Sequence, residues 1–139
     1  MRSLSLNGRE LSVTAHNRFL RLDVEIGKAR YEVGETLEVH LTLRNECEET
    51  VTLVFPTSQV FDFSIEGVDS EFLYIWSSDK MFLQTVTKRE LRRGDSIRQV
   101  LEWTPSRPGT YALKGYTTTF HVHGEKFQLK TRPLIFEVT

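Results

Sequence analysis

The chain has 139 residues, which is the length of one domain and is enough to bury a core without metal ions or disulfides. Its charged fraction of 27%, hydrophobic fraction of 39% and net charge of −1 argue against disorder and against nucleic acid or an anionic membrane as a partner. The single cysteine cannot form an internal disulfide, and no signal peptide or membrane-spanning segment is evident, so we expect a cytoplasmic protein.

The first eighteen residues stand apart from the strand pattern that follows them. Asn7-Gly8 lies between two short runs that contain apolar residues. Asn-Gly is the preferred two-residue hairpin turn, because both positions tolerate positive φ. We therefore predict an N-terminal extension over residues 1–18 that contains a short hairpin, followed by one domain over residues 19–139.

Apolar and polar residues alternate from residue 19 onward, which is typical of half-buried strands. The clearest runs are residues 20–26 and 37–43. A third run, residues 51–55, ends at Pro56, because proline has no amide N–H to donate to a neighbouring strand. Residues 60–66 predict a fourth strand. Residues 72–76 are apolar on both faces, so we expect both faces of that strand to be covered.

The second half of the chain continues the pattern. We predict a strand over residues 81–87 and then a polar loop over residues 88–95. Further strands are expected at residues 97–103, 110–120 and 127–138, the last of them interrupted by Pro133. Eight or nine short strands separated by turns favour an all-β, two-sheet antiparallel sandwich over an up-and-down barrel.

The most specific pattern lies between Phe55 and Gln84, where aromatic and polar residues alternate. Its residues are Phe55, Pro56, Ser58, Gln59, Phe61, Asp62, Phe63, Trp76, Ser77, Phe82 and Gln84. Together with Leu91-x-x-Gly94, Trp103 and Pro108-Gly109-x-Tyr111, they resemble the BsuPI-type intracellular proteinase inhibitor family over residues 20–120. The resemblance implies an immunoglobulin-like β-sandwich that inhibits an intracellular serine protease.

The polar residues of this motif admit two interpretations. Ser58, Gln59, Asp62, Ser77 and Gln84 could form a contact surface for a partner protein. They could instead donate or accept hydrogen bonds with loop backbone beside the motif aromatics, because buried polar groups must be satisfied. We favour the structural interpretation, in which replacing Asp62 with alanine lowers stability first.

Two loops are candidates for contact with a partner. The predicted loop over residues 88–95 carries Lys88, Arg89, Arg92 and Arg93, and such dibasic pairs would suit an acidic specificity pocket. The rival loop, residues 104–109, is stiffened by prolines, which reduce the entropy lost on docking. The sequence leaves this choice open.

Common catalytic and cofactor-binding motifs are missing from the sequence, so we predict a protein that is not an enzyme and has no cofactor. His121 and His123 would share one face of a strand and could hold a metal ion with His40 or Glu125. We favour two solvated histidines and predict no metal site. Cys47 lies in an acidic turn that disfavours a thiolate.

These observations predict a cofactor-free β-sandwich that acts by non-covalent contact with a protein, and the resemblance implies that this protein is a serine protease. The alternative is a structural or adaptor module that binds another protein through a sheet edge near Pro133. A carbohydrate-binding face is a third hypothesis. It would require exposed coplanar aromatic side chains from Tyr74, Trp76 and Tyr116.

Overall fold

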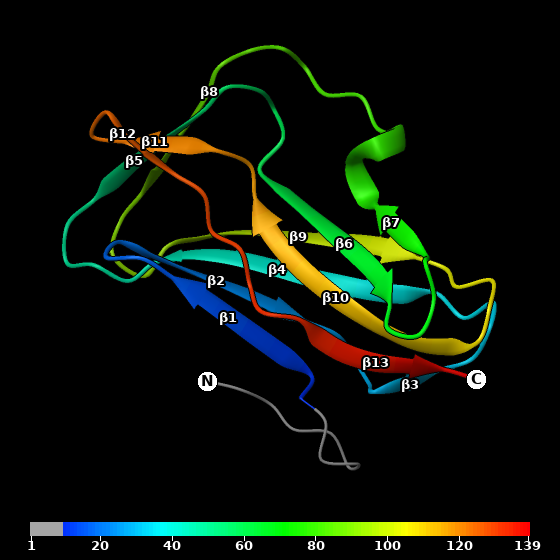
Figure 1. Ribbon diagram of the computed structural model, residues 1–139. Helices are drawn as coiled ribbons and strands as arrows, with labels where there is room; N and C mark the ends of the chain where they lie inside the picture. The colour runs from blue at the N-terminus through cyan, green and yellow to red at the C-terminus, as the bar shows by residue number, and fades with distance from the viewer. Residues whose placement is uncertain (1–9) are drawn as a thin grey trace.

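The computed structural model describes residues 10–139, which form thirteen strands in three sheets and one short 3₁₀ helix (Figure 1). The prediction of an all-β sandwich is confirmed. The strands are more numerous than predicted because bends divide the longer runs; the run over residues 110–120, for example, breaks at residues 118–119. No helix in the described part of the chain is long and apolar enough to cross a membrane.

The first sheet is antiparallel and supplies one layer of the sandwich. In spatial order it contains β1 (Ser12–His16), β2 (Leu20–Glu25), β4 (Leu37–Asn45) and β9 (Ser96–Trp103). In β4, burial alternates along the strand as predicted, because successive side chains of a strand point to opposite faces. Its apolar side chains Leu37, Val39, Leu41 and Leu43 are fully buried.

The second sheet faces the first and contains β6, the first strand after Pro56. In spatial order it contains β3 (Arg30–Tyr31), β13 (Leu134–Val138), β10 (Gly109–Thr117), β6 (Phe61–Gly67) and β7 (Leu73–Ile75). All its pairs are antiparallel except β13 with β3. The edge strand β7 pairs within this sheet only with β6.

A third, smaller sheet lies at one end of the sandwich (Figure 1). In spatial order it contains β12 (Glu125–Phe127), β11 (Phe120–Val122), β5 (Val51–Phe55) and β8 (Thr87–Leu91). Its strand β11 follows β10 after two residues, so the chain passes directly from the second sheet into the third. The 3₁₀ helix η1 (Trp76–Asp79) follows β7 and begins the long connection to β8.

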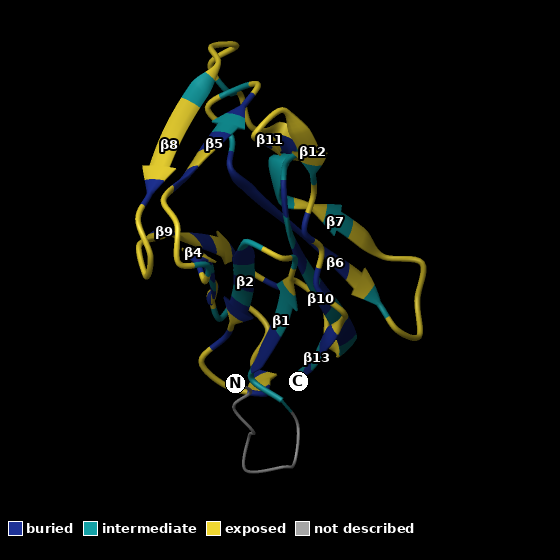
Figure 2. Cartoon of the chain, turned by 90° about the vertical axis from the view of Figure 1, so that its left-hand side faces the viewer, coloured by how far each residue is buried: buried dark blue, intermediate teal, exposed yellow. Residues whose placement is uncertain are grey.

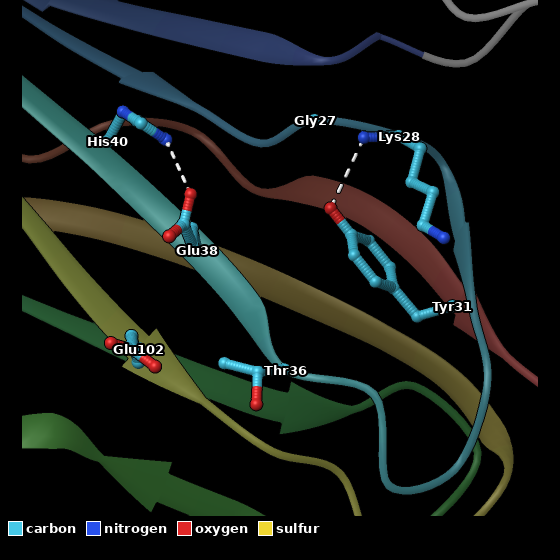
Figure 3. A pocket seen from close by; sticks show the side chains of 7 residues that line it. All are labelled: Gly27, Lys28, Tyr31, Thr36, Glu38, His40 and Glu102. Atoms are coloured by element: carbon cyan, nitrogen blue, oxygen red, sulfur yellow. Dashed lines mark hydrogen bonds and ion pairs between the residues drawn. The ribbon is translucent and has the colours of Figure 1, made fainter.

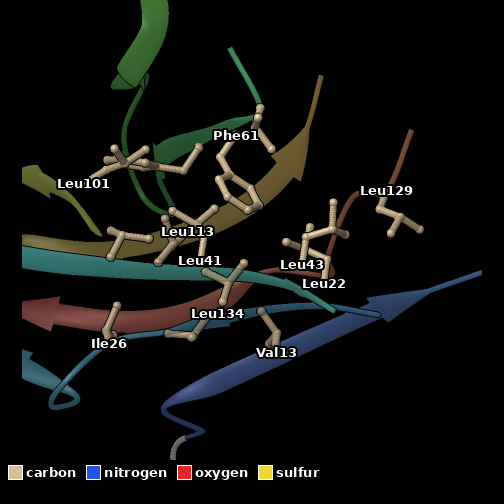
Figure 4. Packing of buried hydrophobic residues seen from close by; sticks show 14 of the residues in the cluster. Val13, Leu22, Ile26, Leu41, Leu43, Phe61, Leu101, Leu113, Leu129 and Leu134 are labelled. Carbon is tan, nitrogen blue, oxygen red and sulfur yellow. The ribbon is translucent and has the colours of Figure 1, made fainter. Parts of the chain in front are cut away.

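The hydrophobic core fills the space between the layers (Figure 4). Leu22 and Leu41 reach it from the first sheet, and Phe61, Leu113 and Leu134 from the second. These five side chains are all at most 1% exposed. One continuous cluster therefore joins both layers, and we attribute most of the stability of the fold to it.

Gly115 permits a close approach of the two layers. A Cβ atom on Gly115 of β10 would lie 2.3 Å from Cγ2 of Val24 on β2. We expect Gly115→Ala to lower the free energy of unfolding by about 1 to 3 kcal/mol, because the added methyl group overpacks the core. Urea denaturation measures this change. Gly27→Ala is the matched control, since its Cβ would meet only the Tyr31 hydroxyl at 3.9 Å; equal losses in both variants would contradict the prediction.

The N-terminal part of the described chain belongs to the first sheet. Residues 12–16, inside the predicted extension, form β1 and pair antiparallel with β2. The side chain of Asn17 accepts hydrogen bonds from the backbone N–H groups of Phe19 and Leu20, both at 2.8 Å, and so shapes the turn between the strands. The predicted Asn7-Gly8 hairpin turn lies outside the described residues.

Two predicted segments differ from the structure. Residues 72–76 were expected to form a strand covered on both faces, and this is wrong. The strand β7 has only three residues, and Leu73 is 58% exposed, because β7 lies at the sheet edge. The predicted strand over residues 81–87 is also wrong, since pairing with β5 begins only at Thr87.

Candidate functional site

The connection between β7 and β8, residues 76–86, contains three of the nine exposed large hydrophobic residues in the described part of the chain and four of the eleven motif residues. We call it the β7–β8 loop. It begins with η1 and continues as irregular chain to Val86. Figure 1 shows it arching over the top of the molecule, on the side of the view opposite β1 and β13.

Asp62 of β6 holds the beginning of this loop. Its side chain is on the face of the strand opposite Phe61 and Phe63, as the alternation predicts, but the residue is only 5% exposed. One carboxylate oxygen accepts the backbone N–H of Phe63 at 2.8 Å and that of Ser77 at 3.1 Å. The other accepts the hydroxyl of Ser77. The carboxylate therefore ties η1 to the second sheet.

Ser58 holds the far part of the loop. Its hydroxyl accepts the backbone N–H of Leu83 at 2.9 Å, and its own N–H donates to the Leu83 carbonyl at 3.0 Å. This pair of bonds joins the loop to the segment between β5 and β6. That segment is itself fixed by two hydrogen bonds. The Thr118 hydroxyl donates to the backbone carbonyl of Gln59 at 2.9 Å, and the side-chain amide of Gln59 donates to the backbone carbonyl of Phe61 at 3.0 Å.

Aromatic contacts brace the middle of the loop. The rings of Trp76 and Phe82 lie 6.0 Å apart, and the ammonium group of Lys80 lies 5.1 Å from the centre of the Trp76 ring. Lys80 also donates a hydrogen bond to Asp79 at 2.7 Å, which raises the pKa of Lys80 and lowers the pKa of Asp79. Gln84, the last motif residue, donates to the Phe82 carbonyl at 3.4 Å.

Between these attachments the loop presents apolar side chains to solvent. Met81 is 97% exposed, Leu83 70% and Val86 60%. Figure 2 shows the connection that enters β8 as exposed chain. Exposed apolar groups gathered on one segment are typical of a protein-contact site. Sequence reasoning missed them because the apolar run Met81-Phe82-Leu83 also fits a strand.

The four basic candidates are divided between a strand and a turn. Lys88 and Arg89 lie on β8, opposite Val54 and Leu53 of β5, so their prediction as loop residues was wrong. Charges were taken as a sign of a loop, but they are equally common on sheet edges, where they discourage pairing with another chain. Arg92 and Arg93 do lie in the turn after β8. All four are exposed, and their role in contact stays a prediction.

The rival loop over residues 104–109 connects β9 and β10 and is well supported. The Tyr111 hydroxyl donates to the Arg107 carbonyl at 2.8 Å, and the Pro105 carbonyl accepts the Gly34 N–H at 2.9 Å. Its exposed residues are polar, proline or glycine. It offers rigidity without the apolar side chains of the β7–β8 loop.

A hollow of about 430 Å³ lies beside β4, away from the motif residues (Figure 3). Most of its titratable groups have partners: His40 lies 3.4 Å from Glu38, the Tyr31 hydroxyl accepts the backbone N–H of Lys28 at 3.2 Å, and the Lys28 ammonium group is paired with Glu35. Burial raises the pKa of Tyr31. The residues that line it resemble a solvated surface more than a reaction centre.

The two histidine candidates do not share a strand face. His121 lies on β11, but the strand ends at Val122 and His123 adopts a positive φ of 52° in the following turn. The ring of His123 contacts Phe19, with centroids 6.0 Å apart. Within residues 10–139 no group of three or more His, Cys, Asp or Glu residues is placed to hold a metal ion.

The aromatic candidates for a sugar-binding face are half-buried. Trp76 packs on Phe82, Tyr74 lies 6.0 Å from the Phe63 ring, and Tyr116 lies beneath the Lys130 ammonium group. Burial raises the pKa of both tyrosines. None of these contacts forms the exposed coplanar pair that the carbohydrate hypothesis requires.

Comparison with known proteins identifies one family. A family model described as BsuPI, intracellular proteinase inhibitor, matches residues 24–122, a span from β2 to β11 that contains the β7–β8 loop and both of its anchors. A comparison with curated proteins finds no match.

Several solved structures align with most of this chain at low identity and with TM-scores under 0.5. A β-glucosidase from Listeria innocua is 15% identical with a TM-score of 0.48, covering 94% of this chain and 16% of its own. The DNA glycosylase AlkC from Pseudomonas fluorescens is 17% identical with a TM-score of 0.44, covering 91% and 30%. The sporulation control protein Spo0M from Bacillus subtilis is 12% identical with a TM-score of 0.46, covering 88% and 50%. This chain thus spans a minor part of the glucosidase, and none of these activities transfers to it.

Proposed function

The chain belongs to the BsuPI family of intracellular proteinase inhibitors, and from this premise we propose that it inhibits a cytoplasmic serine protease by non-covalent contact. The proposal includes no reaction catalysed by this chain and no cofactor. Binding then depends on a few side chains that become buried against the protease.

The exposed and braced β7–β8 loop is the observation that supports this proposal. An inhibitory segment must protrude far enough to enter an active-site cleft. It must also be held in place, because ordering a flexible loop on binding costs conformational entropy. Hydrogen bonds to Asp62 and Ser58 meet the second requirement, and the exposure of Met81 and Leu83 meets the first.

Titration against a panel of purified serine endopeptidases tests the proposal. The panel should include enzymes whose primary specificity pockets are apolar, acidic and small. We expect at least one enzyme to lose its activity at a stoichiometric ratio and to regain it on dilution, with no covalent adduct in the mass spectrum. Unchanged activity of every enzyme in a stoichiometric excess of this protein would reject the proposal.

The adaptor alternative is favoured by a different observation. The edge strand β7 leaves Leu73 58% and Ile75 36% exposed, and an extended peptide could pair with such an edge. The edge near Pro133, which the sequence indicated, is less suitable because β13 lies between β3 and β10. A stable complex with a protein that is not a protease would support this alternative.

A further inference from the structure

We propose that the β7–β8 loop binds the protease cleft as an extended, substrate-like segment, and that Met81 fills the primary specificity pocket. The target protease would then have an apolar pocket. This inference rests on the proposed inhibition and adds to it the contact segment and the class of target.

The placement of Met81 supports its assignment to the specificity pocket. Lys80 has extended backbone dihedrals, with φ of −107° and ψ of 156°, and no regular structure follows until β8. Neighbouring side chains of an extended chain point in opposite directions. Phe82 turns toward Trp76, so Met81 projects outward and is the most exposed large apolar side chain in the described part of the chain, at 97%.

The chemistry of the Met81 side chain indicates that the pocket is apolar. Methionine is unbranched and polarisable, so it adapts to apolar pockets of different shape. An apolar pocket is one of the standard forms that the primary specificity site of serine proteases takes, the others being acidic and small. An almost fully exposed methionine gains most from entering the apolar form, because the whole side chain is removed from water.

The anchors on both sides of Met81 would let the loop resist proteolysis. The N-terminal side is tied to Asp62 through Ser77, and the C-terminal side to Ser58 through Leu83. Hydrolysis of the Met81–Phe82 bond would consume one water and leave a carboxylate on Met81 and an amine on Phe82. Both new ends would stay held close together, so the cleaved form would separate slowly and the bond could re-form by expelling water.

The basic residues are poorly placed for the same role. Arg92 and Arg93 lie in a tight turn, which is closed by the hydrogen bonds between Arg92 and Asp95, and not in an extended segment. The backbone of Lys88 and Arg89 is engaged in the ladder with β5, and entry into a cleft would require that ladder to open. Lys80 adjoins Met81, but its ammonium group is paired with Asp79 and lies against Trp76. We therefore infer an apolar pocket in preference to an acidic one.

Replacing Met81 with arginine tests this inference in the full chain. Against a protease with an apolar pocket, Met81→Arg is expected to weaken inhibition by about 30-fold or more, the effect of losing one binding hot spot. Against trypsin, whose pocket is acidic, the same variant is expected to inhibit better than the wild type. Val100→Arg is the matched control, because Val100 is an exposed valine on β9 in the first sheet, outside the β7–β8 loop.

The possible outcomes separate this inference from the proposed function. If the wild type inhibits and Met81→Arg behaves like Val100→Arg against both enzymes, the inference is wrong and inhibition stands. If the wild type inhibits nothing, the proposed function fails. If wild-type inhibition is lost as the Met81–Phe82 bond is cut, the loop is a substrate and the inference is overturned.

A second pair of variants applies if thermal denaturation shows that Met81→Arg folds poorly. Met81→Leu is then expected to retain inhibition, and Met81→Gln is expected to lose it.

Discussion

Replacing Asp62 with alanine is expected to lower the free energy of unfolding by about 3 kcal/mol and to weaken inhibition as well. The carboxylate accepts three hydrogen bonds, two of them from Ser77. Hydrogen bonds to a charged group are each worth roughly 1.5 to 3 kcal/mol, and removal of the acceptor also leaves buried donors unsatisfied. Chemical denaturation measures the stability change, and titration against the target protease measures the inhibition constant.

The effect of Asp62 on inhibition would arise through the β7–β8 loop, so Asp62 is a positioning residue. Ser77→Ala should reproduce part of the effect, and the double variant should lose less than the sum of the two single changes, because both remove the same contact. Asp62→Asn keeps one acceptor oxygen and should recover part of the inhibition. A loss of stability in Asp62→Ala with an unchanged inhibition constant would show that the bond to Ser77 serves the fold alone.

Replacing Phe63 with alanine is expected to cause the largest loss of stability, about 3 to 5 kcal/mol. Phe63 is next to Asp62 on β6 but points into the core, is 0% exposed and lies 6.0 Å from the Tyr74 ring. The truncation leaves a cavity in a fully buried site. Urea denaturation measures the loss, and Phe63→Leu, which keeps most of the volume, should cost about 1.5 kcal/mol or less.

The two neighbouring residues should differ in their effect on function. The core side chain of Phe63 makes no hydrogen bond to the β7–β8 loop, whereas Asp62 does. At a temperature where both variants remain folded, Phe63→Ala should keep the wild-type inhibition constant and Asp62→Ala should not. Equal weakening in both would mean that inhibition depends on global stability rather than on the loop anchor.

The layers of the sandwich could be read from period-two patterns where one face is buried. Leu20, Leu22 and Val24 alternate with polar residues and are all 0% exposed in the structure. The pattern misled at residues 81–86, which join no sheet although Leu83 is bonded to Ser58. It also misled at β8, because only Leu91 of that edge strand is buried and its charges resemble those of a loop.

The candidate site was only partly predictable for a related reason. The motif residues Ser58, Asp62, Trp76, Ser77 and Phe82 were identified from their order in the chain, and the hydrogen-bonding role of Asp62 was the favoured interpretation. The exposed residue between the anchors was not identified. Its importance depends on what its neighbours contact, and those contacts join residues 15 and 25 positions apart.

The amino-acid sequence by itself determined the all-β class, the buried faces of the main strands and the family, because alternating side chains and an ordered motif are local properties of the chain. Only the tertiary structure decided which apolar segment is exposed between two fixed anchors. Exposure of Met81 results from the packing of Phe82 on Trp76 and the tethering of Leu83 to Ser58. Such contacts form when distant segments meet, and no local pattern specifies them.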